Sequence, residues 1–197
     1  MKGQIVKISS DLHFVNCDDE IFPCKCRGIF RKEHIIPVVG DYVLFSKEKC
    51  LIEEILPRKS EFQRPKVSNI DQAFLITSLV RPDFSTNLLD KLLVTMELHG
   101  VDAVIVITKE DLVKEEDKIK FREILSYYES IGYKVVYNYE IDKIKKLIAG
   151  KTSVFTGQTG AGKSTLLNKL HPGLSLETGE ISDALGRGKH TTRVVEL

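Results

Sequence analysis

The spacing of hydrophobic and polar positions divides the chain into two parts. Residues 1–62 contain short apolar stretches separated by Asp, Gly, Pro and charged residues, and they sustain no long helical period. This pattern predicts a small all-β domain, and we expect a five-stranded barrel. Around residues 62–69 a proline and two basic residues interrupt the pattern. We therefore predict a first domain over 1–66 and a second domain over 67–197.

The second part alternates long apolar strands with helical periods. The predicted strands are 73–80, 101–107, 133–137 and 152–156, and the predicted helices are about 86–99, 115–131, 141–149 and 164–170. This alternation is typical of a doubly wound α/β sheet with parallel strands. In the first helix Leu88, Leu92 and Met96 form an i, i+4 stripe beside Leu89 and Leu93, which we assign to the core. Ser85 or Thr86 is expected to cap this helix.

Composition narrows the class of protein without naming a partner. The 197 residues are 42% hydrophobic and 29% charged, and the formal net charge is +1. These values describe ordinary globular material and give no global signal for nucleic acid or a membrane. The sequence shows no apolar run of membrane-spanning length and no signal-peptide pattern at residues 1–10. We expect a cytoplasmic, monomeric protein without a membrane partner.

All four cysteines fall in the first quarter of the chain, at Cys17, Cys24, Cys26 and Cys50. A four-thiolate zinc site is one interpretation of this grouping. The spacing lacks the paired C-x-x-C knuckles of structural zinc sites, and this favours the alternative of reduced, partly buried thiols.

The segment GQTGAGKS (157–164) matches the phosphate-loop pattern G-x-x-x-x-G-K-S/T. Its glycines leave backbone N–H groups free to surround an anion, and the helix predicted to follow presents its positive end to negative charge. Lys163 is expected to reach the terminal phosphates, and Ser164 is expected to offer its hydroxyl to Mg²⁺. The flanking strand and helix favour this interpretation over a chance glycine-rich turn.

A second motif, TKEDL (108–112), follows the predicted strand 101–107 at the edge where parallel sheets place ligand-contacting loops. It resembles the N-K-x-D motif with which GTPases bind guanine, with Thr108 in place of Asn. A carboxylate at Asp111 can accept hydrogen bonds from the guanine N1–H and exocyclic amine, a pair of donors that adenine lacks. Lys109 could lay its aliphatic stem along the base. Alone, the tetrapeptide is more typical of a charged turn, but its pairing with a phosphate loop favours base recognition.

The two motifs occur in permuted order, because in most GTPases the phosphate loop comes first. This order, PVVGDYV (37–43), RPKVSNIDQ (64–72) and GRGKHTTR (186–193) together resemble the ribosome small subunit-dependent GTPase A family, RsgA or YjeQ. The resemblance covers essentially the whole chain. It implies a barrel of the oligonucleotide/oligosaccharide-binding (OB) type followed by a circularly permuted GTPase. It also implies GTP or GDP and Mg²⁺ as ligands, and the small ribosomal subunit and its rRNA as partners in subunit maturation.

The resemblance also assigns site residues. It places the phosphates among Gly157, Gln158, Thr159, Gly160, Ala161, Gly162, Lys163, Ser164 and Thr165. It places guanine at Thr108, Lys109, Glu110 and Asp111, with Asn138 as a further contact. The usual Ser-Ala pair near Asn138 is missing from YNYEI (137–141). Thr192 is expected to ligate Mg²⁺ and sense the γ-phosphate, and His190 either positions the attacking water or is an exposed loop histidine.

Local clusters suggest where RNA binds. CKCRGIFRK (24–32) carries the cations Lys25, Arg27, Arg31 and Lys32 beside Phe30, a combination suited to phosphates and a stacked base. The alternative is a solvated strand face. A second basic group, at Arg58, Lys59, Arg64 and Lys66, lies at the predicted domain junction.

The resemblance further implies a D-x-P-G segment and a zinc-binding domain after residue 197, so we expect Zn²⁺ only there. On that basis this chain is expected to bind guanine nucleotide better than it hydrolyses it. Two other functions remain open from the sequence: a nucleotide-independent RNA-binding module, and a P-loop enzyme that uses ATP.

Overall fold

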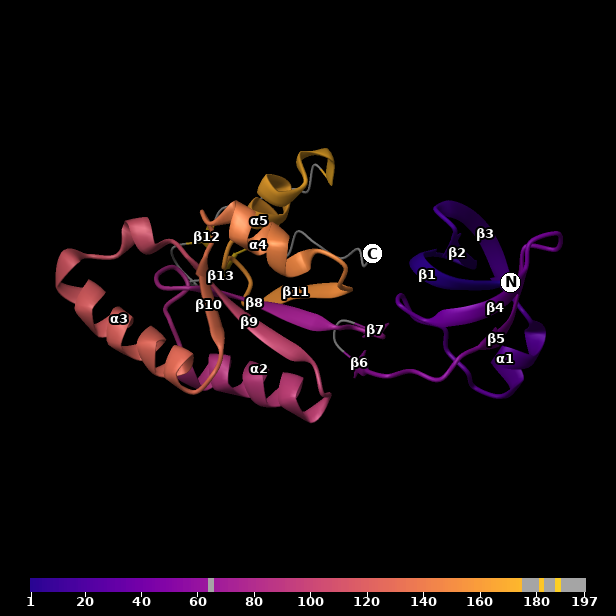
Figure 1. Ribbon diagram of the computed structural model, residues 1–197, viewed down its shortest axis with the longest axis horizontal. Helices are drawn as coiled ribbons and strands as arrows, with labels where there is room; N and C mark the ends of the chain where they lie inside the picture. The colour runs from indigo at the N-terminus through magenta and orange to yellow at the C-terminus, as the bar shows by residue number, and fades with distance from the viewer. Residues whose placement is uncertain (64–65, 175–180, 183–186, 189–197) are drawn as a thin grey trace. The chain divides into compact units, whose positions relative to one another are not determined.

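The computed structural model describes residues 1–63, 66–174, 181–182 and 187–188 (Figure 1). The chain forms two compact units, the first spanning Met1–Ile70 and the second beginning at Asp71. Among the described residues, no helix is both long enough and apolar enough to cross a membrane.

The first unit is a closed five-stranded barrel, as the sequence predicts. Its strands are β1 (Lys2–Ser9), β2 (Leu12–Cys17), β3 (Glu20–Cys26), β4 (Tyr42–Ser46) and β5 (Leu51–Ile55). They follow the order β1-β2-β3-β5-β4, and a parallel pairing of β3 with β5 closes the barrel. Alternate side chains point inward, so that Ile5, Val15, Val43, Phe45 and Ile52 are fully buried in its core.

A short helix, α1 (Gly28–Lys32), follows β3 and was not expected from the sequence. It turns Phe30 into the barrel core, where the side chain is only 6% exposed and packs with Cys24 and Phe45. The interpretation of Phe30 as a stacking aromatic among the surrounding cations is therefore wrong. The helix is only five residues long, too short for a hydrophobic period to reveal it.

A buried carboxylate ties the end of the barrel unit together. Asp41 is 0% exposed and accepts hydrogen bonds from Arg58 Nε at 2.7 Å, Ser68 Oγ at 2.6 Å and the Val38 N–H at 2.8 Å. The hydrogen bond to Asp41 raises the pKa of Arg58, and burial of the guanidinium partly opposes this shift. Ser68 ends the hairpin β6 (Glu61–Gln63) and β7 (Lys66–Ser68). Gly40 has φ +96°, and a Cβ there would lie 2.0 Å from the Ser68 carbonyl oxygen.

These contacts place residues 66–70 with the barrel. The amide of Asn69 adds a 2.9 Å bond to the Gly40 carbonyl. The division between the units falls between Ile70 and Asp71, whereas the sequence analysis placed the domain boundary after residue 66. The side-chain hydrogen bonds of Ser68 and Asn69 hold this segment to the barrel unit, and the hydrophobic pattern of the sequence does not show them.

The second unit is built on a four-stranded parallel sheet, which confirms the predicted α/β class. Its strands are β8 (Gln72–Ser78), β9 (Asp102–Thr108), β10 (Lys134–Tyr137) and β11 (Ser153–Gly157) in the order β10-β9-β8-β11. Its helices are α2 (Thr86–Leu98), α3 (Glu115–Ser130), α4 (Ile141–Ile148) and α5 (Lys163–Leu170), with 3₁₀ turns η1 (Glu110–Leu112) and η2 (Pro172–Leu174). The short strands β12 (Ile181–Ser182) and β13 (Arg187–Gly188) pair with each other.

Helices cover both faces of the sheet. Figure 1 shows α2 on one side and α4 and α5 on the other, and Ile144 and Leu166 bring the latter pair into the core over Phe74. In α2 the buried side chains are Leu89, Leu93 and Met96, while Leu88 is 37% exposed. The buried face of α2 is therefore formed by Leu89, Leu93 and Met96, and it is rotated from the predicted stripe that begins at Leu88.

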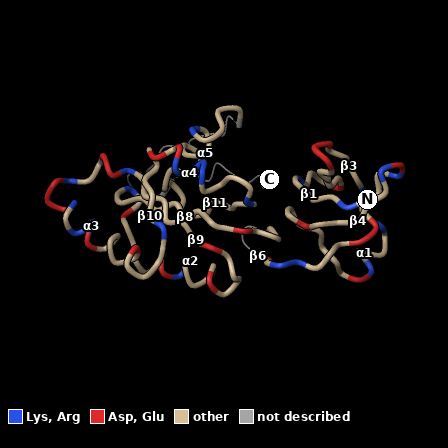
Figure 2. The backbone as a smooth tube through the Cα atoms, viewed as in Figure 1, with Lys and Arg blue, Asp and Glu red and all other residues tan. Residues whose placement is uncertain are grey.

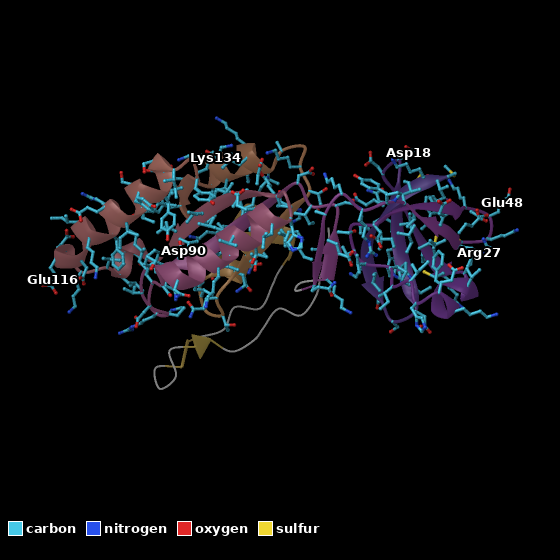
Figure 3. All side chains as sticks on the ribbon, turned by 90° about the horizontal axis from the view of Figure 1, so that it is seen from below. Asp18, Arg27, Glu48, Asp90, Glu116 and Lys134 are labelled. Atoms are coloured by element: carbon cyan, nitrogen blue, oxygen red, sulfur yellow. The ribbon has the colours of Figure 1, made fainter. Side chains whose placement is uncertain are left out.

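Two polar contacts on α2 fix its start and its packing. Ser85 caps the helix, as expected, by accepting a 3.3 Å bond from the Leu88 N–H. Asp90, labelled in Figure 3, accepts a 2.7 Å bond from the Tyr128 hydroxyl of α3. This bond joins the two helices that pack on the same side of the sheet.

Candidate nucleotide-binding site

The phosphate-loop motif forms the turn between β11 and α5. Gly157 ends β11 with φ +152°, and a Cβ there would lie 2.2 Å from the Ile76 carbonyl oxygen, so only glycine fits. Gly162 has φ +94° and precedes the first residue of α5. Inside the turn, the Ala161 N–H donates a 3.1 Å bond to the Gln158 carbonyl. The expected order of strand, loop and helix is present, and the N-terminus of α5 opens at the loop.

Lys163 lies across this loop. Its ammonium donates to the carbonyl oxygens of Gly157 and Gln158, both at 2.9 Å. Burial lowers the pKa of Lys163. A cation in a partly desolvated position gains more from an anionic ligand than an exposed one, so the site favours phosphate. Ser164 and Thr165, both predicted contacts, follow in the first turn of α5.

The TKED segment is bonded directly to the phosphate loop. Thr108 ends β9 with 1% exposure, and its Oγ1 donates a 2.7 Å bond to the Ala161 carbonyl. Lys109 has a left-handed backbone, and its Nζ donates to the Gly160 carbonyl at 2.8 Å and to the Arg81 carbonyl. Burial and the charge of Arg81 lower the pKa of Lys109, and Asp111 partly opposes this shift. The structure therefore brings the two predicted motifs together.

The remaining predicted base contacts lie at the same edge of the sheet. Glu110 and Asp111 form the 3₁₀ turn η1, and the side chain of Asp111 is exposed. Asn138 follows β10, and its N–H donates a 2.9 Å bond to the Ile107 carbonyl. The sequence analysis did not identify Tyr139, whose hydroxyl donates a 3.0 Å bond to Glu110. The sequence feature that could have identified Tyr139 is its position just after the predicted strand 133–137, next to Asn138.

This arrangement suits a phosphorylated nucleotide. Lys163, the backbone N–H groups and the end of α5 are complementary to phosphates, while the Asp111 carboxylate is complementary to a base that presents two donors. The hydroxyl of Ser164 is a hard oxygen ligand of the kind Mg²⁺ prefers. His190 and Thr192 lie outside the described residues.

The predicted RNA contacts lie on and after β3. Lys25, Arg27 and Lys32 are exposed, and Arg31 belongs to α1. Arg27, labelled in Figure 3, precedes the first residue of α1. Figure 2 shows basic and acidic segments interspersed along both units, so these cations form a local group rather than part of a uniformly basic chain.

An aromatic side chain on β2, the strand next to the one that carries Lys25, was missed by the sequence analysis. Phe14 is partly exposed on β2 and is paired in register with Lys7 of β1 and Pro23 of β3. Its neighbour Val15 points into the barrel core, so Phe14 points outward. The alternation of inward and outward positions along β2 is the feature that could have identified Phe14 as an outward-facing residue.

The four cysteines are free thiols. Burial is the main cause that raises the pKa of Cys24 and of Cys26 to about 11, so both stay protonated at neutral pH. Within the described part of the chain, no group of three or more His, Cys, Asp or Glu side chains could hold a metal ion.

Comparison with known proteins gives a consistent match for both units. The family model described as RsgA GTPase matches residues 55–197, and the model described as RsgA N-terminal domain matches residues 2–50. The small ribosomal subunit biogenesis GTPase RsgA 1 of Listeria monocytogenes serotype 4b is 49% identical over 100% of this chain and 70% of its own length. The small ribosomal subunit biogenesis GTPase RsgA of Enterococcus faecalis is 45% identical over 100% of this chain and 68% of its own length.

Solved structures give the same result. YjeQ from Thermotoga maritima has a TM-score of 0.80 and 35% identity, and YloQ, titled a circularly permuted GTPase, has a TM-score of 0.74 and 38% identity. Each match covers 89% of this chain and 66% of the solved chain. The chain thus spans about two thirds of the length of the proteins it matches.

Proposed function

This chain belongs to the RsgA family of GTPases, and from that premise we propose that it binds and hydrolyses GTP during maturation of the small ribosomal subunit. The family consists of GTP-hydrolysing enzymes, and the OB-type barrel and permuted motif order of this chain agree with it. The observation that carries the proposal is the direct bonding of Thr108 and Lys109 to the phosphate loop. A base-reading segment and a phosphate-binding segment held together in this way suit one nucleotide.

The phosphates of the nucleotide would lie over residues 157–165. There Lys163 and the backbone N–H groups meet negative charge, and Ser164 would be a ligand of Mg²⁺. When bound, Mg²⁺ neutralises charge on the β- and γ-phosphates. Lys163 would exchange its bonds to the Gly157 and Gln158 carbonyls for bonds to phosphate oxygens.

Guanine would be read by Asp111. Its carboxylate accepts from the N1–H and the exocyclic amine, and rejection of adenine follows because adenine offers no such pair. Lys109 would hold its aliphatic stem along the base, and Asn138 would contribute from the loop after β10. Glu110 and Thr108 shape the turn that carries Asp111.

Hydrolysis needs groups that act on the γ-phosphate. We assign Thr192 as a ligand of Mg²⁺ that senses this phosphate, and His190 as the residue that positions the attacking water. Both assignments rest on the family resemblance of GRGKHTTR (186–193).

The partner we propose is rRNA of the small subunit in the cytoplasm, contacted by the barrel. Lys25, Arg27, Arg31 and Lys32 would bind phosphates, and a base would stack on Phe14 rather than on the buried Phe30. Two relatives are named small ribosomal subunit biogenesis GTPases, which supports the small subunit as the partner.

Titration of the chain with GDP, GTP, ADP and ATP tests the proposed nucleotide. We expect binding of both guanine nucleotides and affinity for the adenine nucleotides lower by at least about a hundredfold. Equal affinity for ATP would favour the ATP-using enzyme, and the failure of any nucleotide to bind would favour the RNA-binding module. Hydrolysis of GTP measured with and without purified small subunits tests the coupling to the ribosome, because we expect the subunits to raise the rate.

A further inference from the structure

Tyr139 lies beside the segment proposed to read guanine. Its hydroxyl donates a 3.0 Å hydrogen bond to Oε2 of Glu110, the residue immediately before Asp111. Tyr139 follows β10 and Glu110 follows β9, so the bond joins two loops at the carboxyl edge of the sheet.

The loop that carries Tyr139 is itself held in place. The rings of Tyr137 and Tyr139 are stacked, with centroids 5.4 Å apart and an interplanar angle of 15°. The Tyr137 N–H donates a 2.7 Å bond to Glu140 Oε2, and the Asn138 N–H donates to the Ile107 carbonyl at 2.9 Å. Tyr139 is 61% exposed, but its ring stacks on Tyr137 and its turn is held by these hydrogen bonds.

The segment that carries Asp111 is fixed from two sides. On one side, Lys109 is bonded to the Gly160 carbonyl of the phosphate loop. On the other side, Glu110 accepts from Tyr139, while its own carbonyl accepts a 3.0 Å bond from the Val113 N–H and closes the turn η1. Asp111 lies within this turn, so the direction of its carboxylate depends on both anchors.

We propose that Tyr139 is a positioning residue for guanine recognition, because its bond to Glu110 orients the η1 turn so that Asp111 meets both donors of the base. The inference rests on the proposed function, in which Asp111 reads guanine. A carboxylate that accepts two hydrogen bonds at once needs a defined direction, whereas one bond tolerates more movement. Tyr139 thus acts on specificity through Asp111 without contacting the base.

The protonation of Tyr139 supports this role. Burial, and then the bond to Glu110, raise the pKa of Tyr139 to about 12. A tyrosine with the ordinary pKa of 10.0 already donates at neutral pH, and the raised pKa keeps the Tyr139 hydroxyl a donor to Glu110 at more alkaline pH as well.

Tyr139→Phe is the test, because it keeps the ring and removes only the donor. The readout is the ratio of affinities for GDP and inosine diphosphate, whose base keeps N1–H and lacks the exocyclic amine. We expect the preference for GDP to fall about threefold to tenfold, the range that one hydrogen bond contributes. An unchanged ratio would overturn the inference.

Tyr133→Phe is the matched control. The Tyr133 hydroxyl donates a 3.2 Å bond to Glu97 near the amino ends of β9 and β10, so the variant loses the same kind of bond away from the base. We expect its GDP to inosine diphosphate ratio to equal that of the parent protein. An equal fall in both variants would show a general loss of packing and would overturn the positioning role.

Two further variants separate this inference from the proposed function. If Asp111→Asn leaves GDP affinity unchanged, the base-reading role of Asp111 fails; if it weakens GDP binding while Tyr139→Phe leaves the ratio unchanged, only the inference fails. The double variant Tyr139→Phe/Glu110→Ala should show no greater loss of preference for GDP than either single variant. Each substitution alone already removes the same Tyr139–Glu110 hydrogen bond. Additive losses would overturn the proposed route through Glu110.

Discussion

The hydroxyl of Thr108 donates a 2.7 Å hydrogen bond to the backbone carbonyl of Ala161, which lies 53 positions later in the chain. This bond explains why the permuted order of the motifs is compatible with one site. Parallel strands present their carboxyl ends at one edge of a sheet, and loops at that edge meet whatever their order in sequence. The Lys109 bond to Gly160 repeats the connection one residue further on.

Thr108→Val tests this connection. The variant keeps the shape of the side chain and leaves the Ala161 carbonyl without its donor in a buried position, so we expect a loss of about 1–2 kcal/mol of unfolding free energy. GDP affinity should also fall, because the phosphate loop loses one of its anchors. Urea unfolding and fluorescent GDP titration measure the two effects. Thr108→Ser is the control, since it retains the hydroxyl and should stay close to the parent protein.

Asp111→Asn tests base recognition. An amide at this position meets the guanine amine with a donor and repels it, whereas xanthine presents an exocyclic oxygen that accepts from the amide. We expect GDP affinity to fall and xanthosine diphosphate affinity to rise, each by at least about tenfold. Competition titrations with both nucleotides measure the exchange. Parallel changes in both affinities would contradict the assignment.

Lys163→Met tests how the charge of Lys163 affects GDP affinity and the free energy of unfolding. GDP affinity should fall about tenfold to a hundredfold, as expected for loss of charged hydrogen bonds to phosphate. Burial lowers the pKa of Lys163 below 10.5, so at neutral pH its charge opposes folding, and this penalty disappears as pH rises toward 10.5. The variant also loses the bonds to the Gly157 and Gln158 carbonyls, a loss that does not depend on pH, so the expected titration effect is a gain in relative unfolding free energy that is full at pH 7 and shrinks at alkaline pH. Denaturant unfolding at several pH values measures this gain, and a constant difference would contradict its origin in titration.

Asp41→Ala tests the carboxylate that ties the barrel unit together. Removing one partner of a buried pair leaves Arg58 without its main partner, so we expect a loss of about 3–5 kcal/mol in the first unit. Amide exchange over residues 1–70 should show the loss, while GDP affinity stays unchanged. The control is Glu20→Ala, which removes the exposed pair with Lys47 and should change exchange very little.

Replacing Lys25, Arg27, Arg31 and Lys32 together with Ala tests the RNA surface. Binding to small subunits should weaken, and the slope of log affinity against log salt should fall by about 0.7 for each phosphate that the variant no longer binds. Phe14→Ala should weaken binding without changing this slope, because stacking releases no counterions. The control replaces Lys143, Lys145 and Lys146 of α4, and an effect there alone would move the RNA surface to the second unit.

The strands of the parallel sheet and the helices α2 to α5 were predictable because their hydrophobic periods are local. The predicted strand 101–107 and β9 differ by one residue at each end, and the predicted helix 115–131 matches α3 to within one residue. The class of site was also predictable, since the phosphate-loop and TKED patterns each occupy a few consecutive residues. A parallel sheet then places both at one edge without further information.

Contacts between distant side chains were not predictable. Nothing local shows that a five-residue helix turns Phe30 into the core, because α1 is too short for a hydrophobic period. Asp41 and Ser68 are ordinary turn residues in sequence, and only the folded barrel brings them within 2.6 Å. Tyr139 and Glu110 are 29 positions apart, so their bond has no signature in the sequence.

β8 lies between β9, which follows it after one helix, and β11, which the chain reaches much later. Thr152, just before β11, bonds to Asp71, just before β8, across 81 positions. Because a protein is synthesised from its N-terminus and gains structure as it emerges, we expect β8, β9 and β10 to assemble while β11 is still being made. The loops after β9 and β10 would then fold first on the nascent chain, and the segment that carries Asp111 would gain its anchor at the Gly160 carbonyl only when β11 and the phosphate loop join β8.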